Sequence, residues 1–138
     1  MKFPKKVLAM AILLILCCSV GMIMPASATE IQPLYLATLE ASADLSISSR
    51  GTATCSIYVE TNLPSQSIEV TTTLYRIGGG PDTPVASWSD SMNHIVSNTQ
   101  TRGVSKGYNY QLRSHITIKN SSGGMIESFW RHSNTVYY

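Results

Sequence analysis

The stretch KGYNYQLRSHITIK, residues 106–119, decides the fold class of this chain. Successive side chains of an extended strand point to opposite faces, and here one face is mainly apolar, carrying Tyr108, Tyr110, Leu112, Ser114, Ile116 and Ile118. The other face is polar and carries Asn109, Gln111, Arg113, His115, Thr117 and Lys119. Alternation over about six pairs of residues predicts a strand with one face in a core and the other in water. No other segment alternates for as long, so we expect it at the centre of a sheet.

The chain beyond residue 43 contains further segments of the same period, separated by turn residues such as Gly78-Gly79-Gly80-Pro81-Asp82. The second-best pattern places Ala53, Cys55, Ile57 and Val59 inward, and the next places Ile68, Val70, Thr72 and Leu74 inward. This spacing predicts an all-β fold, a single immunoglobulin-like antiparallel β-sandwich of about seven strands. The predicted strands are residues 44–49, 52–60, 67–76, 84–90, 95–102, 106–119 and 125–138.

Some details of this sandwich stay open at the level of sequence. Residues 34–39 fit either a short strand or a turn of helix. In the last strand, either Ile126, Ser128 and Trp130 or Met125, Glu127 and Phe129 face the core. The polar segment 95–102 is expected at a sheet edge, and Trp88 is expected in the core.

The predicted strands 52–60 and 106–119 take the places of strands B and F in an immunoglobulin domain, where antibodies carry bridging cysteines. Cys55 lies on the first, and Leu112 lies about where the second cysteine would be. We therefore interpret Cys55 as a small buried apolar residue. Either Tyr108 or Tyr110 is placed to act as a tyrosine corner.

The first 28 residues have the features of a secretion signal. Lys2, Lys5 and Lys6 precede an uncharged run over residues 7–24, and Pro25 then ends any helix. Ala26 and Ala28 supply the small residues of a cleavage site after Ala28. We thus expect a signal helix (1–28), a lead-in segment (29–42) and the sandwich (43–138), with the protein secreted. The alternative is a membrane anchor through an uncleaved N-terminal segment, because the uncharged run is just long enough to span a bilayer.

Charge and cysteine content narrow the possible partners. Beyond the signal, the chain has seven basic and eight acidic residues, which gives a formal charge of −1. This balance gives no basic face for nucleic acid and no polybasic patch for a membrane after signal cleavage. Cys55 is the one cysteine outside the signal, so no intramolecular disulfide is expected. Export without disulfides is more typical of Gram-positive bacteria than of a eukaryotic secretory pathway.

A search for reactive constellations gives no catalytic, cofactor-binding or metal-binding residue. His94, His115 and His132 are not at metal-ligand spacing from one another. The many serines include no nucleophile elbow, and an inward Cys55 is shielded. We therefore expect a protein that is not an enzyme and needs no cofactor.

Aromatic side chains are the features most able to bind a partner. Tyr58, Tyr75 and Trp130 are the possible surface binding aromatics, since outward aromatics on a flat sheet can stack on sugar rings or anchor a protein. The competing interpretation is that they only cover neighbouring strands as cross-strand pairs. The candidate partners are accordingly a cell-wall glycan or an extracellular protein.

Four segments together resemble a known group of proteins: LSISSRGTATCSIYV (45–59), TLYR (73–76), SWS (87–89) and KGYNYQL (106–112). They are similar to small secreted Ig-like β-sandwich proteins of Gram-positive, often anaerobic, bacteria, a domain family of unknown function. The resemblance implies a signal peptide followed by one Ig-like domain, and it brings no catalytic residues. The final HSNTVYY (132–138) lies outside it.

These observations favour a secreted, non-enzymatic β-sandwich that binds a partner outside the cell or at its surface. One alternative is a small secreted hydrolase or lytic factor, which a clustering of Asp90, Glu127 or a histidine in one concave pocket would favour. Another is a structural subunit of an extracellular assembly that associates through the edge strand at 95–102.

Overall fold

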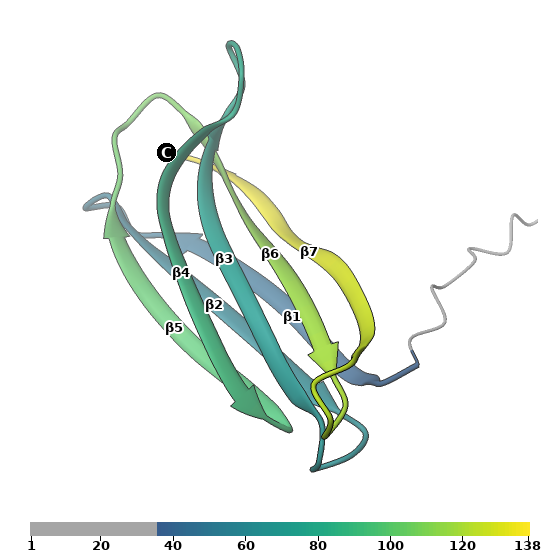
Figure 1. Cartoon of the computed structure of the whole chain (residues 1–138). Helices are drawn as coiled ribbons and strands as arrows, with labels where there is room; N and C mark the ends of the chain where they lie inside the picture. The colour runs from purple at the N-terminus through teal and green to yellow at the C-terminus, as the bar shows by residue number, and fades with distance from the viewer. Residues whose placement is uncertain (1–35) are drawn as a thin grey trace, which may run out of the picture. The chain divides into compact units, whose positions relative to one another are not determined.

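The computed structural model describes residues 36–138, which form seven antiparallel strands in two sheets and no helix, as predicted (Figure 1). One sheet has the order β1-β2-β5 and the other β4-β3-β6-β7. The strands are β1 (Thr38–Ile47), β2 (Thr52–Thr61), β3 (Ser67–Ile77), β4 (Thr83–Asn93), β5 (Ile95–Gly103), β6 (Asn109–Lys119) and β7 (Met125–Tyr137). The predicted signal peptide and cleavage residues, Ala26 and Ala28, lie outside the described residues. Within residues 36–138 no helix is long and apolar enough to cross a bilayer.

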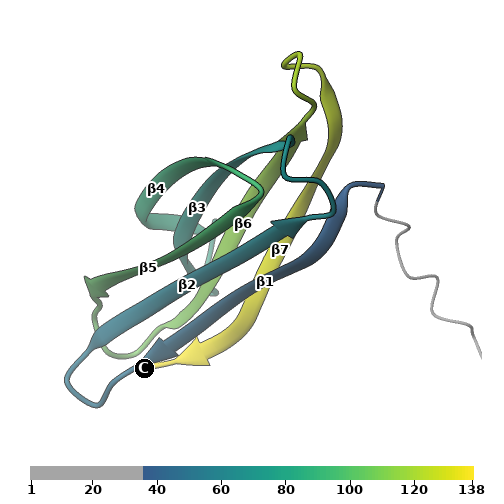
Figure 2. The same cartoon turned by 90° about the horizontal axis from the view of Figure 1, so that it is seen from below.

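The chain passes between the sheets in the Greek-key order expected of an Ig-like sandwich. The β1–β2 hairpin starts one sheet, the β3–β4 hairpin lies in the other, β5 returns to the first and β6–β7 completes the second (Figure 2). β6 lies between β3 and β7, so the central position predicted for it is confirmed. β5 is an edge strand, also as predicted.

The core lies between the sheets and contains the residues that the alternation placed inward, except Tyr108. This residue precedes β6 and is 40% exposed, so its predicted inward position is wrong. Two apolar clusters fill it. One includes Ile57, Val59, Ile68, Val70, Ile116 and Ile118, and the other includes Ala53, Cys55, Leu74, Tyr110 and Leu112. Trp88 is half-buried and packs against the second cluster from β4. Thr72 and Ser114 bring two buried hydroxyls into the core and pair with each other at 2.9 Å, because buried polar groups need a partner.

The first strand starts at Thr38, inside the segment expected to be a lead-in, so the sandwich includes residues 38–42 as well. The start of this strand is fixed by Glu127 of β7. Its Oε2 atom accepts hydrogen bonds from the backbone N–H of Ala37 (3.1 Å), the backbone N–H of Thr38 (3.2 Å) and Oγ1 of Thr38 (3.1 Å). One carboxylate therefore joins the facing edges of the two sheets, an arrangement that strand pattern alone does not predict.

The register of β7 follows neither of the two expected patterns along its whole length. Its pairing with β6 shifts between Ile118 and Lys119 and again between Gln111 and Arg113. The first irregularity lets both Ile126 and Phe129 pack against the same core cluster, although simple alternation puts them on opposite faces. Trp130 is 55% exposed and lies on the outer face.

The C-terminal segment closes one end of the sandwich. At the second irregularity in β7, the buried Ser133 hydroxyl accepts the backbone N–H of Leu112 at 2.9 Å. Tyr138 exchanges backbone hydrogen bonds with Tyr108, and its hydroxyl donates to the carbonyl oxygen of Ser49 at 3.2 Å. Residues 132–138 are thus an integral part of the fold.

Candidate binding site on the four-stranded sheet

A hollow of about 320 Å³ lies on the outer face of the four-stranded sheet and is lined by Tyr75, Arg113, Trp130 and His132. These residues come from three adjacent strands, β3, β6 and β7. Arg113 pairs directly with His132 across β6 and β7, and Tyr75 pairs with Gln111, two residues before Arg113. Since neighbouring strands are about 4.8 Å apart, outward side chains at these positions meet over the sheet.

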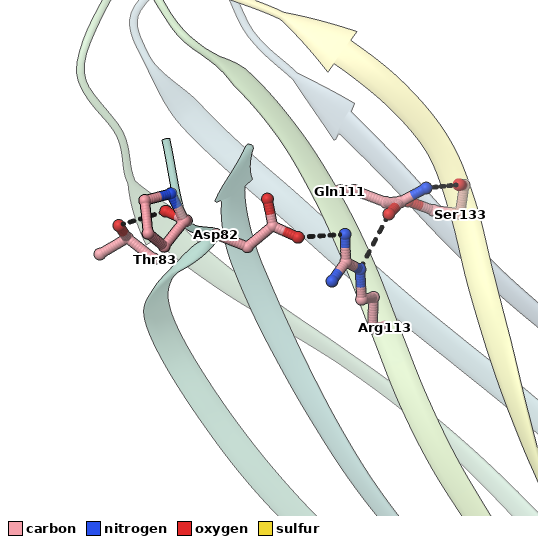
Figure 3. Close-up of polar contacts among 6 residues, drawn as sticks. Asp82, Thr83, Gln111, Arg113 and Ser133 are labelled. Atoms are coloured by element: carbon pink, nitrogen blue, oxygen red, sulfur yellow. Dashed lines mark hydrogen bonds and ion pairs between the residues drawn. The ribbon is translucent and has the colours of Figure 1, made fainter. Parts of the chain in front are cut away.

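The guanidinium of Arg113 is held from three directions. It lies over the Tyr75 ring, with Cζ 4.9 Å from the ring centroid. Its Nε donates to Oε1 of Gln111 at 2.9 Å, and its Nη2 forms an ion pair with Oδ2 of Asp82 at 2.7 Å. Figure 3 shows Arg113 between these two partners, with Gln111 in turn contacting the Ser133 carbonyl oxygen at 3.4 Å. The cation therefore has a defined position at one side of the hollow.

Trp130 forms the aromatic part of the site and is flanked by two histidines. The His115 ring centroid is 4.8 Å from the indole, and the His132 centroid is 6.4 Å from it. A contact of 2.9 Å between Nε2 of His115 and the Ser128 hydroxyl orients the first imidazole. More than half of Trp130 stays in solvent, so part of the indole is available to an apolar surface of a ligand.

The structure brings together two of the three aromatics proposed from the sequence. Tyr75 and Trp130 line the same hollow, whereas Tyr58 lies on β2 in the other sheet. The Tyr58 hydroxyl donates to Oε2 of Glu60 at 2.7 Å. This hydrogen bond is the main cause that raises the pKa of Tyr58, followed by burial and the nearby carboxylates. Tyr58 is thus engaged within its own strand, away from the hollow.

Sequence reasoning missed Arg113, His115 and His132 as members of one site. Arg113 and His115 were correctly placed on the polar face of their strand, but nothing in the sequence indicated what lay beside them. The missing information was the pairing of β6 with β7, which sets His115 opposite Trp130. The sequence could have revealed this cluster only through the β7 register that places Trp130 on the outer face.

The other reactive groups lie at separate places. Asp90 accepts a hydrogen bond from Nδ2 of Asn98 at 2.7 Å, Glu127 holds the start of β1, and His94 lies at the β4–β5 turn beside the Thr61 hydroxyl. Burial raises the pKa of the Cys55 thiol to about 11, which keeps it protonated at neutral pH. Among residues 36–138 no group of three His, Cys, Asp or Glu side chains is placed to hold a metal ion.

Comparison with known proteins adds a distant structural likeness. No protein-family model matches the chain, and no curated protein matches it. Among solved structures, it is similar to Bacteroides uniformis β-glucuronidase 2, covalently bound to cyclophellitol-6-carboxylate aziridine, with 16% sequence identity and a TM-score of 0.38. The match covers 69% of this chain and 12% of that chain, so the likeness involves only a small part of the enzyme.

Proposed function

We propose that this protein is a secreted, non-enzymatic binding module that takes a glycan on the outer face of β3, β6 and β7. The observation that carries the proposal is the meeting of Tyr75, Arg113 and Trp130, from three different strands, in one hollow. The predicted signal peptide supports a location outside the cell or at its surface. The resemblance to small secreted Ig-like proteins of Gram-positive bacteria supports the same location.

The chemistry of the hollow suits a sugar. A pyranose ring has an apolar C–H face and a rim of hydroxyl groups. The exposed indole of Trp130 offers a flat surface to the C–H face, in the manner of other aromatic contacts. Arg113 and His132 offer polar groups at the same hollow to the hydroxyl groups of the sugar. Its volume of about 320 Å³ is near the lower end of small-molecule sites, which run from roughly 300 to 1,000 Å³, so a short part of a glycan chain is the best fit.

The placement of the acidic residues supports binding over hydrolysis. Most glycosidases use two carboxyl groups about 5–9.5 Å apart on either side of the scissile bond. Asp90 is bonded to a β5 side chain and Glu127 to the β1 backbone, and neither lines the hollow. The secreted hydrolase is therefore the weaker alternative.

A glycan and cell-wall fragment array probed with residues 29–138 tests the proposal, with two matched aromatic variants. We expect Trp130→Ala to weaken binding at least roughly tenfold, as loss of a central aromatic contact does. Tyr58→Ala removes an aromatic from the other sheet and should leave binding unchanged. No bound glycan, or equal losses in both variants, would contradict the proposal. Retention of a protein from culture medium, with no glycan bound, would replace the glycan by an extracellular protein.

A second candidate function is assembly through β5. This edge strand pairs with β2 over Ile95–Gly103 without a register shift. Its sequence, IVSNTQTRG, has no proline and no lysine, two devices that commonly protect sheet edges from pairing with another chain. A structural subunit would self-associate in sedimentation velocity, and Thr99→Pro would abolish the association. A strictly monomeric profile over a wide concentration range contradicts this candidate.

A further inference from the structure

The β3–β4 loop (residues 78–82) supplies the acidic partner of the hollow. Its three glycines have φ angles of +91°, +79° and +151°, a region of backbone space that other residues rarely adopt. A Cβ atom built at Gly79 or Gly80 would meet nothing within 4 Å, so there is open space beside this part of the loop. Asp82 ends the loop and reaches back to Arg113 (Figure 3).

The ion pair between Asp82 and Arg113 joins a loop residue to a residue in the middle of the sheet. Arg113 is fixed on β6 by Gln111 and by the Tyr75 ring. Asp82 contacts the guanidinium through one carboxylate oxygen, and the two side chains are 36% and 27% exposed, respectively. Ion pairs with this degree of exposure stabilise only weakly. A second carboxylate with a favourable position on the sheet can therefore compete with Asp82.

We propose that the hollow binds a uronic acid unit, a sugar whose own carboxylate replaces that of Asp82 on Arg113. The inference rests on the proposed function and adds the ligand class and the response of the loop. In the free protein Asp82 occupies the anion position. In the complex the sugar ring lies on Trp130, its carboxylate pairs with Arg113, and the β3–β4 loop moves away.

The charges around the hollow agree with an acidic ligand. Arg113 and His132 line it, and His115 lies against Trp130 on the same face. Asp82 is the carboxylate paired with Arg113 among the described residues, and it is the group that the ligand displaces. The next acidic side chain of this face, Glu69, is paired with Lys119 at 2.6 Å. A guanidinium also matches a carboxylate in shape, since its planar N–H groups can bond both oxygens at once.

The test measures affinity for short oligomers of galacturonic and glucuronic acid, with the carboxyl-reduced form of each oligomer as the neutral probe. The reduced probes keep the linkage and ring and lose only the charge. We expect the wild-type protein to prefer the acidic probes. Asp82→Asn should strengthen binding of the acidic probes by about twofold to fivefold, because an exposed ion pair no longer competes, and leave the neutral probes unchanged. Arg113→Gln should abolish the preference, and all variants should keep the wild-type circular dichroism spectrum.

The outcomes separate this inference from the proposed function. Equal binding of acidic and reduced probes, weaker acidic binding by Asp82→Asn, or no binding of either uronate would overturn the uronate proposal. If another glycan on the array still depends on Trp130 in any of these cases, the proposed function survives alone. If Trp130→Ala changes no binding at all, the proposed function fails as well.

Discussion

The hydroxyl of Tyr110 bonds both backbone groups of Ser105, donating to its carbonyl oxygen at 2.9 Å and accepting from its N–H at 3.1 Å. The phenol is 2% exposed and lies two residues before Leu112. These features identify Tyr110, and not Tyr108, as the tyrosine corner of the sandwich. One side chain thus fixes the bend through which the chain passes from β5 to β6.

Tyr110→Phe should lower the free energy of unfolding by about 1–3 kcal/mol, because it leaves two backbone groups of Ser105 without their partner. In urea melts, a lower midpoint with an unchanged m-value (the dependence of the unfolding free energy on urea concentration) would show that stability changed and the unfolded state did not. Tyr108 is 40% exposed, so Tyr108→Phe is the matched control, with an expected effect within about 0.5 kcal/mol. Equal effects of the two changes would refute the assignment.

Leu112→Ala should destabilise the domain by about 2–5 kcal/mol, the usual range for a leucine removed from a packed core. Leu112 is fully buried in the middle of β6, whereas Leu63 in the β2–β3 loop is 52% exposed. Leu63→Ala is therefore the control and should have little effect. A loss below about 1 kcal/mol for Leu112→Ala would be inconsistent with its place in the core.

Gly51→Ala should destabilise the domain more than Gly79→Ala, by about 1 kcal/mol or more. The two glycines have nearly equal φ angles of +81° and +79°, so both variants carry the strain of a positive φ. A Cβ at Gly51 would lie 3.0 Å from the carbonyl oxygen of Val104 and 3.0 Å from the Tyr138 ring, whereas one at Gly79 meets nothing within 4 Å. Thermal melts compare the pair, and equal shifts would show that this corner is loosely packed.

Stability should fall as the pH rises above about 9 because of Cys55. Burial raises the pKa of this thiol from 9.0 to about 11 in the folded protein. The unfolded chain therefore loses the thiol proton first, so the stabilisation is complete below pH 9 and disappears progressively between pH 9 and 11. Urea melts of wild type and Cys55→Ala across this window isolate the effect, since the variant lacks the ionisable group. Parallel pH profiles would contradict the prediction.

Cys55→Ser should lower stability moderately, since it buries a hydroxyl in place of a thiol, and should leave glycan binding unchanged. Binding assays on the folded variant check this prediction. Loss of binding without unfolding would give the thiol a direct role.

The fold was largely predictable because strand alternation and turn residues carry most of its information. The inward residues of β2, β3 and β6 follow period two without interruption, and each is buried. β7 was not predictable in register, since its irregular pairing near Ile126 and Ser133 breaks that period. The early part of β1 was missed because its anchor, Glu127, is about 90 residues away along the chain.

The candidate site was only partly predictable, because it depends on neighbours across strands. Tyr75 and Trp130 were recognisable as outward aromatics from their own segments. Their meeting with Arg113 depends on the order β3-β6-β7, which a single strand pattern does not contain. Asp82 was recognised only as a turn residue, since its ion pair with β6 crosses 31 positions of sequence, from 82 to 113.

The carboxylate of Glu127 also determines how the domain responds to mechanical force. Tension that enters the domain at Ala37 meets two anchors at the same point: the hydrogen bonds to the Glu127 carboxylate and the backbone hydrogen bond from Asn62 to the Ala37 carbonyl oxygen. The hydrogen bonds of Glu127 therefore resist separation of β1 from the domain when force is applied at its N-terminal end. Pulling from that end loads the β7 backbone through Glu127, so force is shared between both sheets from the start.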